Sequence, residues 1–300
     1  MKNNYILYIG NTPTVRLREI ERFFALKSRL FAKLENKNPT GSVKDRAALF
    51  IMRAAREVGS IEKGGRVIEA TSGNMGISLS MLSGIFDYRS IIFMPENMSE
   101  GRAELIKKYG AELILTPVLE GMEGAVRRAE EMARETKNSY TPGQFYNKKG
   151  VFAHFFGTGS ELFADMGGRI DSLVCGVGTA ATLVGAGRYL KRRLPRLRLV
   201  AVEPSESALL SGGKSGRHII EGIGAGFIPP LYDADLVDRV ISLPGDSAVE
   251  MRRLLSRLEG IDVGISSGAA LGAAIMLARE SDREQNIAMI FPDSGDRYST

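Results

Sequence analysis

The chain has 300 residues, 44% of them hydrophobic and 25% charged, which suits one or two globular domains and excludes a disordered or fibrous protein. Forty basic against 35 acidic residues give a net charge of +5, too small to indicate nucleic-acid or membrane binding. Because Cys175 is the single cysteine, an intrachain disulfide and a cysteine-based metal site are also excluded. No signal peptide or membrane span is expected, so we predict a soluble, cytoplasmic protein.

Strand-like and helical patterns alternate along most of the chain. The first long helix is predicted at 43–58, where apolar residues recur with helical spacing and Gly59 suits the helix end. Short runs rich in Val, Ile and Leu predict strands at 66–70, 90–94, 112–116, 172–177, 198–203, 239–243 and 287–291. Further helices are predicted at 99–109, 123–136, 182–194, 247–258 and 267–278. This order predicts an α/β fold with open, twisted, mostly parallel sheets that are covered by helices.

The segment 38–46, NPTGSVKDR, places Lys44 in the first turn of the first long helix. The positive end of the helix dipole disfavours a charged lysine there, which suits a lysine that reacts as a neutral amine in a Schiff base. A solvated lysine at a helix end is the alternative, and this segment alone favours it.

Two other segments run from a predicted strand into a helix. The first, 69–76 (EATSGNMG), could hold an anion on backbone N–H groups and hydroxyls, or could be a capped turn without a ligand. The second, 176–182 (GVGTAAT), suits a phosphate. It also matches a dinucleotide pattern built on Gly176, Gly178 and Ala181, with Glu203 ending the next strand, so a nicotinamide or flavin oxidoreductase stays a rival.

Two glycine-containing segments lie in the second half of the chain. Taken alone, 221–226 (EGIGAG) is typical of a mobile connection and 292–298 (PDSGDRY) of a solvated turn. His154 and His218 are the only histidines, and no spacing predicts a metal site.

In their order along the chain, these segments resemble the cysteine synthase (O-acetylserine sulfhydrylase) family. Its members are pyridoxal-phosphate enzymes of the tryptophan-synthase-β fold type, also called fold type II. The resemblance runs nearly end to end. It rests on IGNTP at 9–13, KLE at 33–35, NPTGSVKDR at 38–46, TSGNMG at 71–76, MPE at 94–96, GAEL at 110–113, AVEPSES at 201–207, LSGGK at 210–214, EGIGAGFIP at 221–229, GISSGAA at 264–270 and PDSGDRY at 292–298.

The resemblance implies a role for each matching residue. Lys44 is expected to form the Schiff base with pyridoxal 5′-phosphate and to move the substrate α-proton, while Asn74 bonds the cofactor's phenolic oxygen. Ser294 is expected beside the pyridine nitrogen. The remaining cofactor-binding residues would be Gly178, Thr179, Ala180, Ala181, Thr182 and Gly222. The substrate carboxylate would be held by Thr71, Ser72, Met75 and Gln144.

The activity implied is β-replacement: L-cysteine forms from O-acetyl-L-serine and sulfide through an aminoacrylate intermediate. The resemblance also implies a homodimer, and serine acetyltransferase as a further partner. It divides the chain into a smaller, mobile domain at 35–147 with the substrate loop, and a larger domain of 1–34 plus 148–300 with the phosphate loop.

Three segments depart from the family's usual pattern. Ala180 and Ala181 stand where GTGGT has two glycines, and if either position needs a positive φ, alanine costs about 1 kcal/mol or more. Met75 stands where threonine is usual, which removes a hydroxyl near the substrate carboxylate. Segment 154–161 reads HFFGTGSE, where a threonine pair and a proline are usual.

Other functions remain open on the same fold. The donor could be O-phosphoserine, for which Arg217 and His218 lie near the 221–226 loop, or the product could be cystathionine or cyanoalanine. A catalytically weakened regulatory paralogue is a further alternative, and the intact Lys44, Asn74 and Ser294 argue against it.

Overall fold

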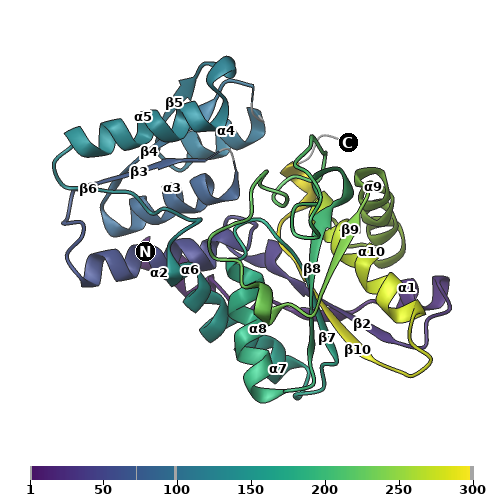
Figure 1. Cartoon of the computed structure of the whole chain (residues 1–300). Coiled ribbons are helices and arrows are strands. Elements are labelled where there is room, and N and C mark those ends of the chain that lie inside the picture. Colours follow the sequence, from purple (N-terminus) through teal and green to yellow (C-terminus); the bar gives the residue numbers. More distant parts are fainter. Residues whose placement is uncertain (1, 72, 98–99, 298–300) are drawn as a thin grey trace. The chain divides into compact units, whose positions relative to one another are not determined.

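The computed structural model describes residues 2–71, 73–97 and 100–297, which form two compact α/β units (Figure 1). Unit 1 contains the residues up to Ile9 and Lys44–Gly150, and unit 2 contains Gly10–Val43 and the chain from Val151 onward. These boundaries differ from the predicted ones, which placed residues 1–34 in the larger domain and 35–147 in the smaller one: here the residues up to Ile9 belong to unit 1, and residues 35–43 belong to unit 2. Ile6 and Ile9 pack in a core cluster of unit 1, whereas Val43 is hydrogen-bonded to Pro292 of unit 2.

Unit 1 is built around a four-stranded parallel sheet in the order β5-β4-β3-β6. Its strands are β3 (Arg66–Ala70), β4 (Arg89–Pro95), β5 (Glu112–Thr116) and β6 (Ser139–Tyr140). Its helices are α2 (Lys44–Glu57), α3 (Asn74–Phe86), α4 (Glu100–Lys108) and α5 (Gly121–Glu135), and α6 (Lys148–Ala153) begins at its end. Alternate residues of the strands face opposite layers: Ile91 and Phe93 pack with α5, whereas Ile92 packs with α3 and α4.

Unit 2 is built around a six-stranded sheet in the order β1-β2-β10-β7-β8-β9. Its strands are β1 (Thr14–Arg16), β2 (Arg29–Leu34), β7 (Ser172–Gly176), β8 (Arg198–Pro204), β9 (Arg239–Leu243) and β10 (Asn286–Phe291). Its helices are α1 (Arg18–Phe23), α7 (Ser160–Asp165), α8 (Ala181–Arg193), α9 (Gly245–Leu254) and α10 (Ile265–Arg279), with π-helical turns at His154–Gly159 and Leu255–Glu259. Of the strand pairs described, β1 with β2 is antiparallel and the others are parallel.

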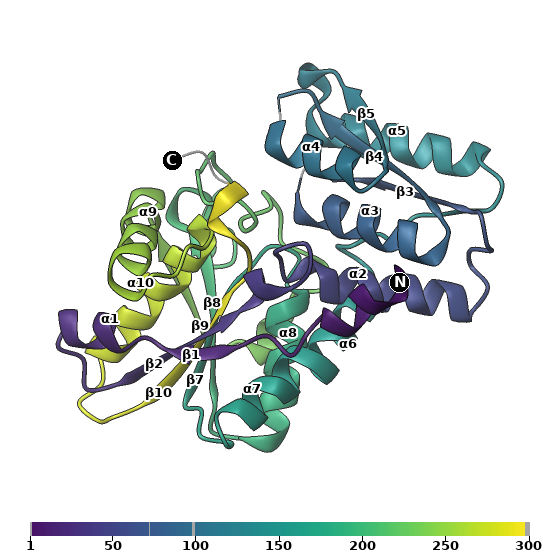
Figure 2. The same ribbon diagram turned by 180° about the vertical axis from the view of Figure 1, so that it is seen from behind.

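The sheet of unit 2 is buried on both faces. Val174 points to a cluster with α1, α9 and α10, while its neighbours Leu173 and Cys175 point to a cluster with α7 and α8. Figures 1 and 2 show these two groups of helices on opposite sides of β7 and β10. Burial on both faces explains why these strands read as continuous apolar runs.

The predicted fold class is confirmed, and each predicted strand forms with ends within one residue of those expected. The sequence patterns did not reveal β1, β2, β6 and the short helices α1, α6 and α7. Strands β1 and β6 have three and two residues and each of the three helices has six, too short for a periodic pattern. Strand β2 is longer than those two strands, but the buried Lys33 interrupts its apolar run. Within the described residues, no helix combines the length and the apolar character that crossing a bilayer requires.

Candidate active site

Four loops of unit 2 leave its sheet at the carboxyl ends of neighbouring parallel strands. They follow β2, β10, β7 and β8, and parallel pairing places all four along one edge. This edge is where open α/β sheets bind their ligands. Most of the residues predicted to hold the cofactor in unit 2 belong to these loops.

The loop that leads to Lys44 is hydrogen-bonded to the loop that carries Ser294. Val43 N donates to Pro292 O (2.8 Å), and Ser294 N donates to Gly41 O (3.1 Å). Gly41 has φ +78°, and a Cβ there would lie 3.0 Å from the Arg297 guanidinium, so glycine suits both the turn and the close approach. Since Lys44 directly follows Val43, the chain reaches the predicted Schiff-base lysine from a segment anchored beside Ser294.

The predicted phosphate loop joins β7 to the N-terminus of α8. Ala180, the residue before the helix, is left-handed with φ 67° and ψ −6°, and Ala181 is the first helical residue. Ala180 therefore meets the condition under which alanine is strained, whereas Ala181 does not. The first N–H group of α8, that of Ala181, lies 3.4 Å from Thr179 Oγ1, and the N–H groups that follow in the first turn remain suited to an anion.

The turn before this helix is packed closely by the 221–226 loop. A Cβ on Gly178 would lie 2.3 Å from Gly222 O, and Gly224 N donates to Val177 O (3.0 Å). Both Gly222 (φ +88°) and Gly224 (φ +66°) have positive φ values. The two glycine segments therefore form one backbone-lined cradle, with the helix N-terminus and the hydroxyls of the phosphate loop beside it. This donor set fits a phosphate monoester such as pyridoxal 5′-phosphate.

The dinucleotide interpretation required a carboxylate at the end of β8 that is available to a ribose. Instead, Glu203 is 2% exposed, and its oxygens accept hydrogen bonds from Leu210 N (2.7 Å), Ser211 N (3.1 Å) and Ser242 Oγ (3.1 Å). Glu203 therefore fixes the loop that follows β8. We reject the dinucleotide interpretation on this ground.

In unit 1, the segments predicted to hold the substrate share another sheet edge. Thr71 directly follows β3, Gln144 follows β6, and these strands are parallel neighbours. Thr71 is buried and Gln144 is half-buried. Gly73 N donates to Thr71 Oγ1 (3.2 Å), and a Cβ on Gly73 would meet nothing within 4 Å, so the turn has open space beside it.

Glu69 connects these two substrate segments, a function that the sequence patterns did not reveal. Its Oε2 accepts a hydrogen bond from Gly143 N (2.8 Å), next to Gln144, and its backbone lies in β3 just before Thr71. Burial raises the pKa of the Glu69 carboxyl to about 7, while the N–H groups of Gly143, Ala70 and Gln144 act to lower it. A glutamate inside an otherwise apolar strand was the signal that could have identified it.

Lys44 and Asn74 are the first residues of α2 and α3. Ser78 Oγ lies 2.6 Å from Asp45 Oδ1 and 3.0 Å from Asn74 O, so one buried hydroxyl connects the first turns of both helices. Lys44 is half-buried, in keeping with a side chain that reaches a site rather than bulk solvent.

Met75 is 2% exposed and packs in the core cluster of unit 1 with Ala47, Ala48 and Ile51. Its side chain therefore belongs to the α2–α3 interface, and its backbone N–H is the part left to contact a carboxylate. Ser72 lies outside the described residues.

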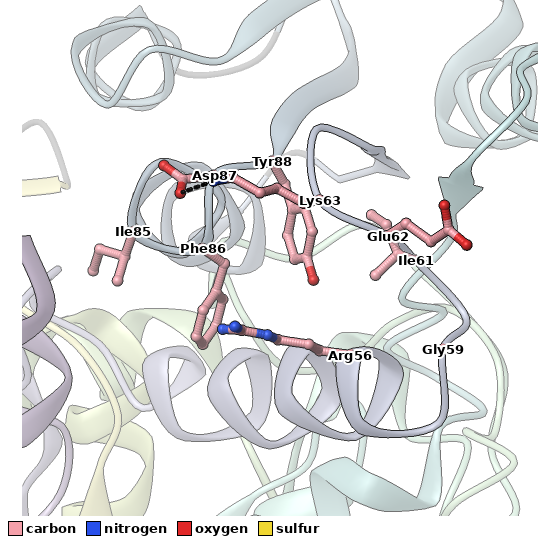
Figure 3. Close-up of a pocket in the computed structure, with 9 residues that line it drawn as sticks. All are labelled: Arg56, Gly59, Ile61, Glu62, Lys63, Ile85, Phe86, Asp87 and Tyr88. Atoms are coloured by element: carbon pink, nitrogen blue, oxygen red, sulfur yellow. Dashed lines mark ion pairs between the residues drawn. The ribbon is translucent and has the colours of Figure 1, made fainter.

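A surface cavity of 430 Å³ in unit 1 contains none of the predicted site residues (Figure 3). It is lined by Arg56 at the end of α2, by Phe86 at the end of α3 and by the turns that follow these helices. Lys44 and Asn74 begin the same two helices, so the cavity lies about 18 Å along α2 from Lys44. The geometry separates this cavity from the candidate site.

Comparisons with known proteins show the family to which the chain belongs. The sequence profile of the pyridoxal-phosphate dependent enzyme family matches residues 5–293. The chain is 42% identical over 297 residues to a cysteine synthase of Staphylococcus aureus, covering 99% of this chain and 95% of that protein.

Two solved structures resemble the fold closely. A cysteine synthase from Entamoeba histolytica has a TM-score of 0.95 and 39% sequence identity, covering 99% of this chain and 88% of that one. A hydrogen sulfide-producing enzyme from Fusobacterium nucleatum has a TM-score of 0.94 and 39% identity, covering 99% of both chains.

Proposed function

Because the chain belongs to the pyridoxal-phosphate dependent enzyme family, we propose that it makes L-cysteine from O-acetyl-L-serine and sulfide by β-replacement. The chain is an enzyme that uses pyridoxal 5′-phosphate, and its full-length similarity to cysteine synthases from two organisms supports this reaction. The structural observation that carries the proposal is the pairing of segment 41–43 with segment 292–294. That pairing anchors the approach to Lys44 beside Ser294.

The residues that would hold the cofactor fall into three groups. Lys44 would bind it covalently and Asn74 would bond its phenolic oxygen. Ser294 would offer a neutral hydroxyl to the pyridine nitrogen. The phosphate would be held by the N-terminus of α8 and by Gly178, Thr179, Ala180, Ala181 and Thr182, with Gly222 packed beneath the turn.

When bound, pyridoxal phosphate withdraws electrons from the substrate's α-carbon. The substrate's own amine would displace Lys44 from the cofactor, and the freed Lys44 amine would take the proton from that carbon and return it once sulfide has replaced acetate at the β-carbon. Unlike an aspartate, the Ser294 hydroxyl carries no charge that would keep a proton on the pyridine nitrogen. Without that proton the cofactor would withdraw electrons less strongly, which favours prompt loss of the β-substituent.

The substrate carboxylate would be held at the edge of unit 1. Thr71, Ser72, the Met75 N–H and the Gln144 amide are the proposed donors. Glu69 supports this arrangement because its carboxylate holds the loop before Gln144. Closure of these segments on the carboxylate would exclude water from the reacting atoms.

Assembly and location are proposals that come from the family resemblance. We propose a homodimer and binding of serine acetyltransferase, both testable by analytical ultracentrifugation of the purified protein with and without that partner. We also propose a cytoplasmic location. The buried free thiol of Cys175 suits a reducing compartment.

The visible absorption spectrum tests the reaction directly. The purified protein should show a Schiff-base band that shifts when O-acetylserine is added and returns when sulfide follows. A band that is unchanged by O-acetylserine but shifts with O-phosphoserine would show that O-phosphoserine is the donor. A protein that shows no band after incubation with pyridoxal 5′-phosphate would contradict the proposed function.

A further inference from the structure

His154 is a buried histidine whose two ring nitrogens both contact hydroxyl groups. It is 1% exposed and opens the π-helical turn His154–Gly159. Its Nδ1 lies 2.9 Å from Thr158 Oγ1, and its Nε2 lies 3.2 Å from Thr182 Oγ1. Thr182 is the second residue of α8, in the proposed phosphate loop. The ring therefore lies directly behind one of the hydroxyls assigned to the cofactor phosphate.

Two glycines bring this histidine close to α8. A Cβ on Gly185 would lie 2.3 Å from Val151 O and 2.6 Å from His154 Cβ. A Cβ on Gly159 would lie 2.9 Å from Tyr189 Cβ. The segment with His154 and the first half of α8 thus pack with their backbones in close approach. Such contact fixes the ring against Thr182, since neither backbone has room to move toward the other.

The direction of the hydrogen bonds decides what Thr182 can offer to a ligand. A neutral imidazole has one N–H and one lone pair. With the hydrogen on Nε2, the ring donates to Thr182 Oγ1 and accepts from the Thr158 hydroxyl, so the hydrogen of Thr182 is free to point into the loop. With the hydrogen on Nδ1, Nε2 accepts that hydrogen and Thr182 has none left to donate. A phosphate accepts hydrogen bonds only, so it requires the first arrangement.

We propose that His154 is a positioning residue that directs the Thr182 hydroxyl hydrogen toward the cofactor phosphate. The donors run in one direction, from Thr158 through His154 to Thr182 and the phosphate. This inference rests on the proposed function, because it assumes that the loop at 178–182 holds the phosphate of pyridoxal 5′-phosphate.

Two amide substitutions separate the two sides of the ring. His154→Gln keeps a donor near the position of Nε2, whereas His154→Asn keeps a polar group near Nδ1 only. We expect the Asn variant to bind pyridoxal 5′-phosphate about tenfold more weakly, and the Gln variant to stay within about threefold of the wild type. Equilibrium dialysis of the apoenzymes measures both constants, and ³¹P NMR reports whether the bound phosphate signal shifts.

Pyridoxal, which lacks the phosphate, distinguishes positioning from general stability. The affinity for pyridoxal should be the same in all three proteins. An Asn variant that weakens both ligands equally, or neither, would overturn the inference while leaving the proposed function intact. If the wild-type apoenzyme fails to bind pyridoxal 5′-phosphate at all, both the function and the inference fall.

Two further variants test the inference without changing His154, in case the His154 variants do not fold. Thr158→Val removes the first donor with little change of shape, and it should weaken pyridoxal 5′-phosphate about threefold without affecting pyridoxal. An unchanged ratio of the two affinities would count against the inference. Ser160→Ala is the matched control, because the Ser160 hydroxyl contacts the carbonyls of Phe156 and Gly157 and not the ring. It should leave both affinities unchanged.

Discussion

The hydroxyl oxygen of Ser78 lies 2.6 Å from Oδ1 of Asp45, and both residues are fully buried. This contact connects the first turn of α3 to the first turn of α2. Lys44 and Asn74, the first residues of those helices, are the residues proposed to bind the cofactor. A buried polar contact within unit 1 therefore holds the first turns of these two helices together.

Ser78→Ala should lower the free energy of unfolding by about 1–3 kcal/mol, because the buried Asp45 carboxylate loses a hydrogen-bond donor. Urea denaturation measures this difference. Ser80→Ala is the matched control: Ser80 is equally buried, but its hydroxyl bonds to Gly76 O in the same helix (2.7 Å). That bond contributes little to stability. If both variants lose the same free energy of unfolding, the contact with Asp45 contributes no more to stability than the bond within the helix does.

Ala180→Gly and Ala181→Gly should change stability in opposite directions. Ala180 has φ 67°, where glycine avoids a steric cost, so its replacement should stabilise the protein by about 0.5–1 kcal/mol. Ala181 is helical, so glycine there should destabilise by about the same amount. Thermal unfolding of the two apoenzyme variants and of the wild-type apoenzyme measures these changes in stability. Destabilisation by both substitutions would mean that position 180 carries no strain.

Glu69→Gln should remove a pH dependence from stability. The carboxyl pKa is about 7 in the folded protein against an ordinary value of 4.5, so the folded state holds its proton longer than the unfolded chain does. The protonated carboxyl's contribution to the free energy of unfolding is complete below pH 4.5, and it is lost as the pH rises from 4.5 through 7. The loss amounts to about 3 kcal/mol.

The Gln variant should therefore gain stability relative to the wild type between pH 5 and pH 8. Denaturation curves at those two pH values provide the measurement. A constant difference would show that Glu69 is ionised in both states. Above pH 7, where the Glu69 carboxyl is ionised, the variant should also raise the KM for O-acetylserine, since the loop before Gln144 loses a charged acceptor.

Lys44→Ala should reduce turnover of O-acetylserine with sulfide by at least about 10²–10⁴-fold, the range of a lost acid–base group. Lys37→Ala, seven residues upstream and exposed, is the control and should keep full activity. After borohydride treatment, mass spectrometry should find the cofactor attached to the peptide with Lys44 in the wild type and in the Lys37 variant. A cofactor attached to another lysine would contradict the assignment.

The long elements and the order of the site segments could be predicted because each is a local pattern. The strand 172–177 is a continuous apolar run, and Lys44 follows a turn sequence that begins a helix. Other features depend on contacts distant in sequence. The positive φ of Ala180 depends on how β7 enters α8, and the contact of His154 with Thr182 depends on Gly185. The function of Glu69 depends on a loop 74 residues away. No local pattern contains these relationships.

The discontinuity of unit 2 has a consequence for synthesis on the ribosome. Strand β2 pairs with β10, which is made more than 250 residues later, whereas the part of unit 1 from Lys44 to Gly150 is contiguous in sequence. Unit 1 can therefore fold while the rest of the chain is still being translated. The segment that contains β1 and β2 has an unpaired edge until β10 has been synthesised. During that interval, chaperones or the segment's own charged residues, among them Arg29 and Lys33, must keep this unpaired edge from pairing with other chains.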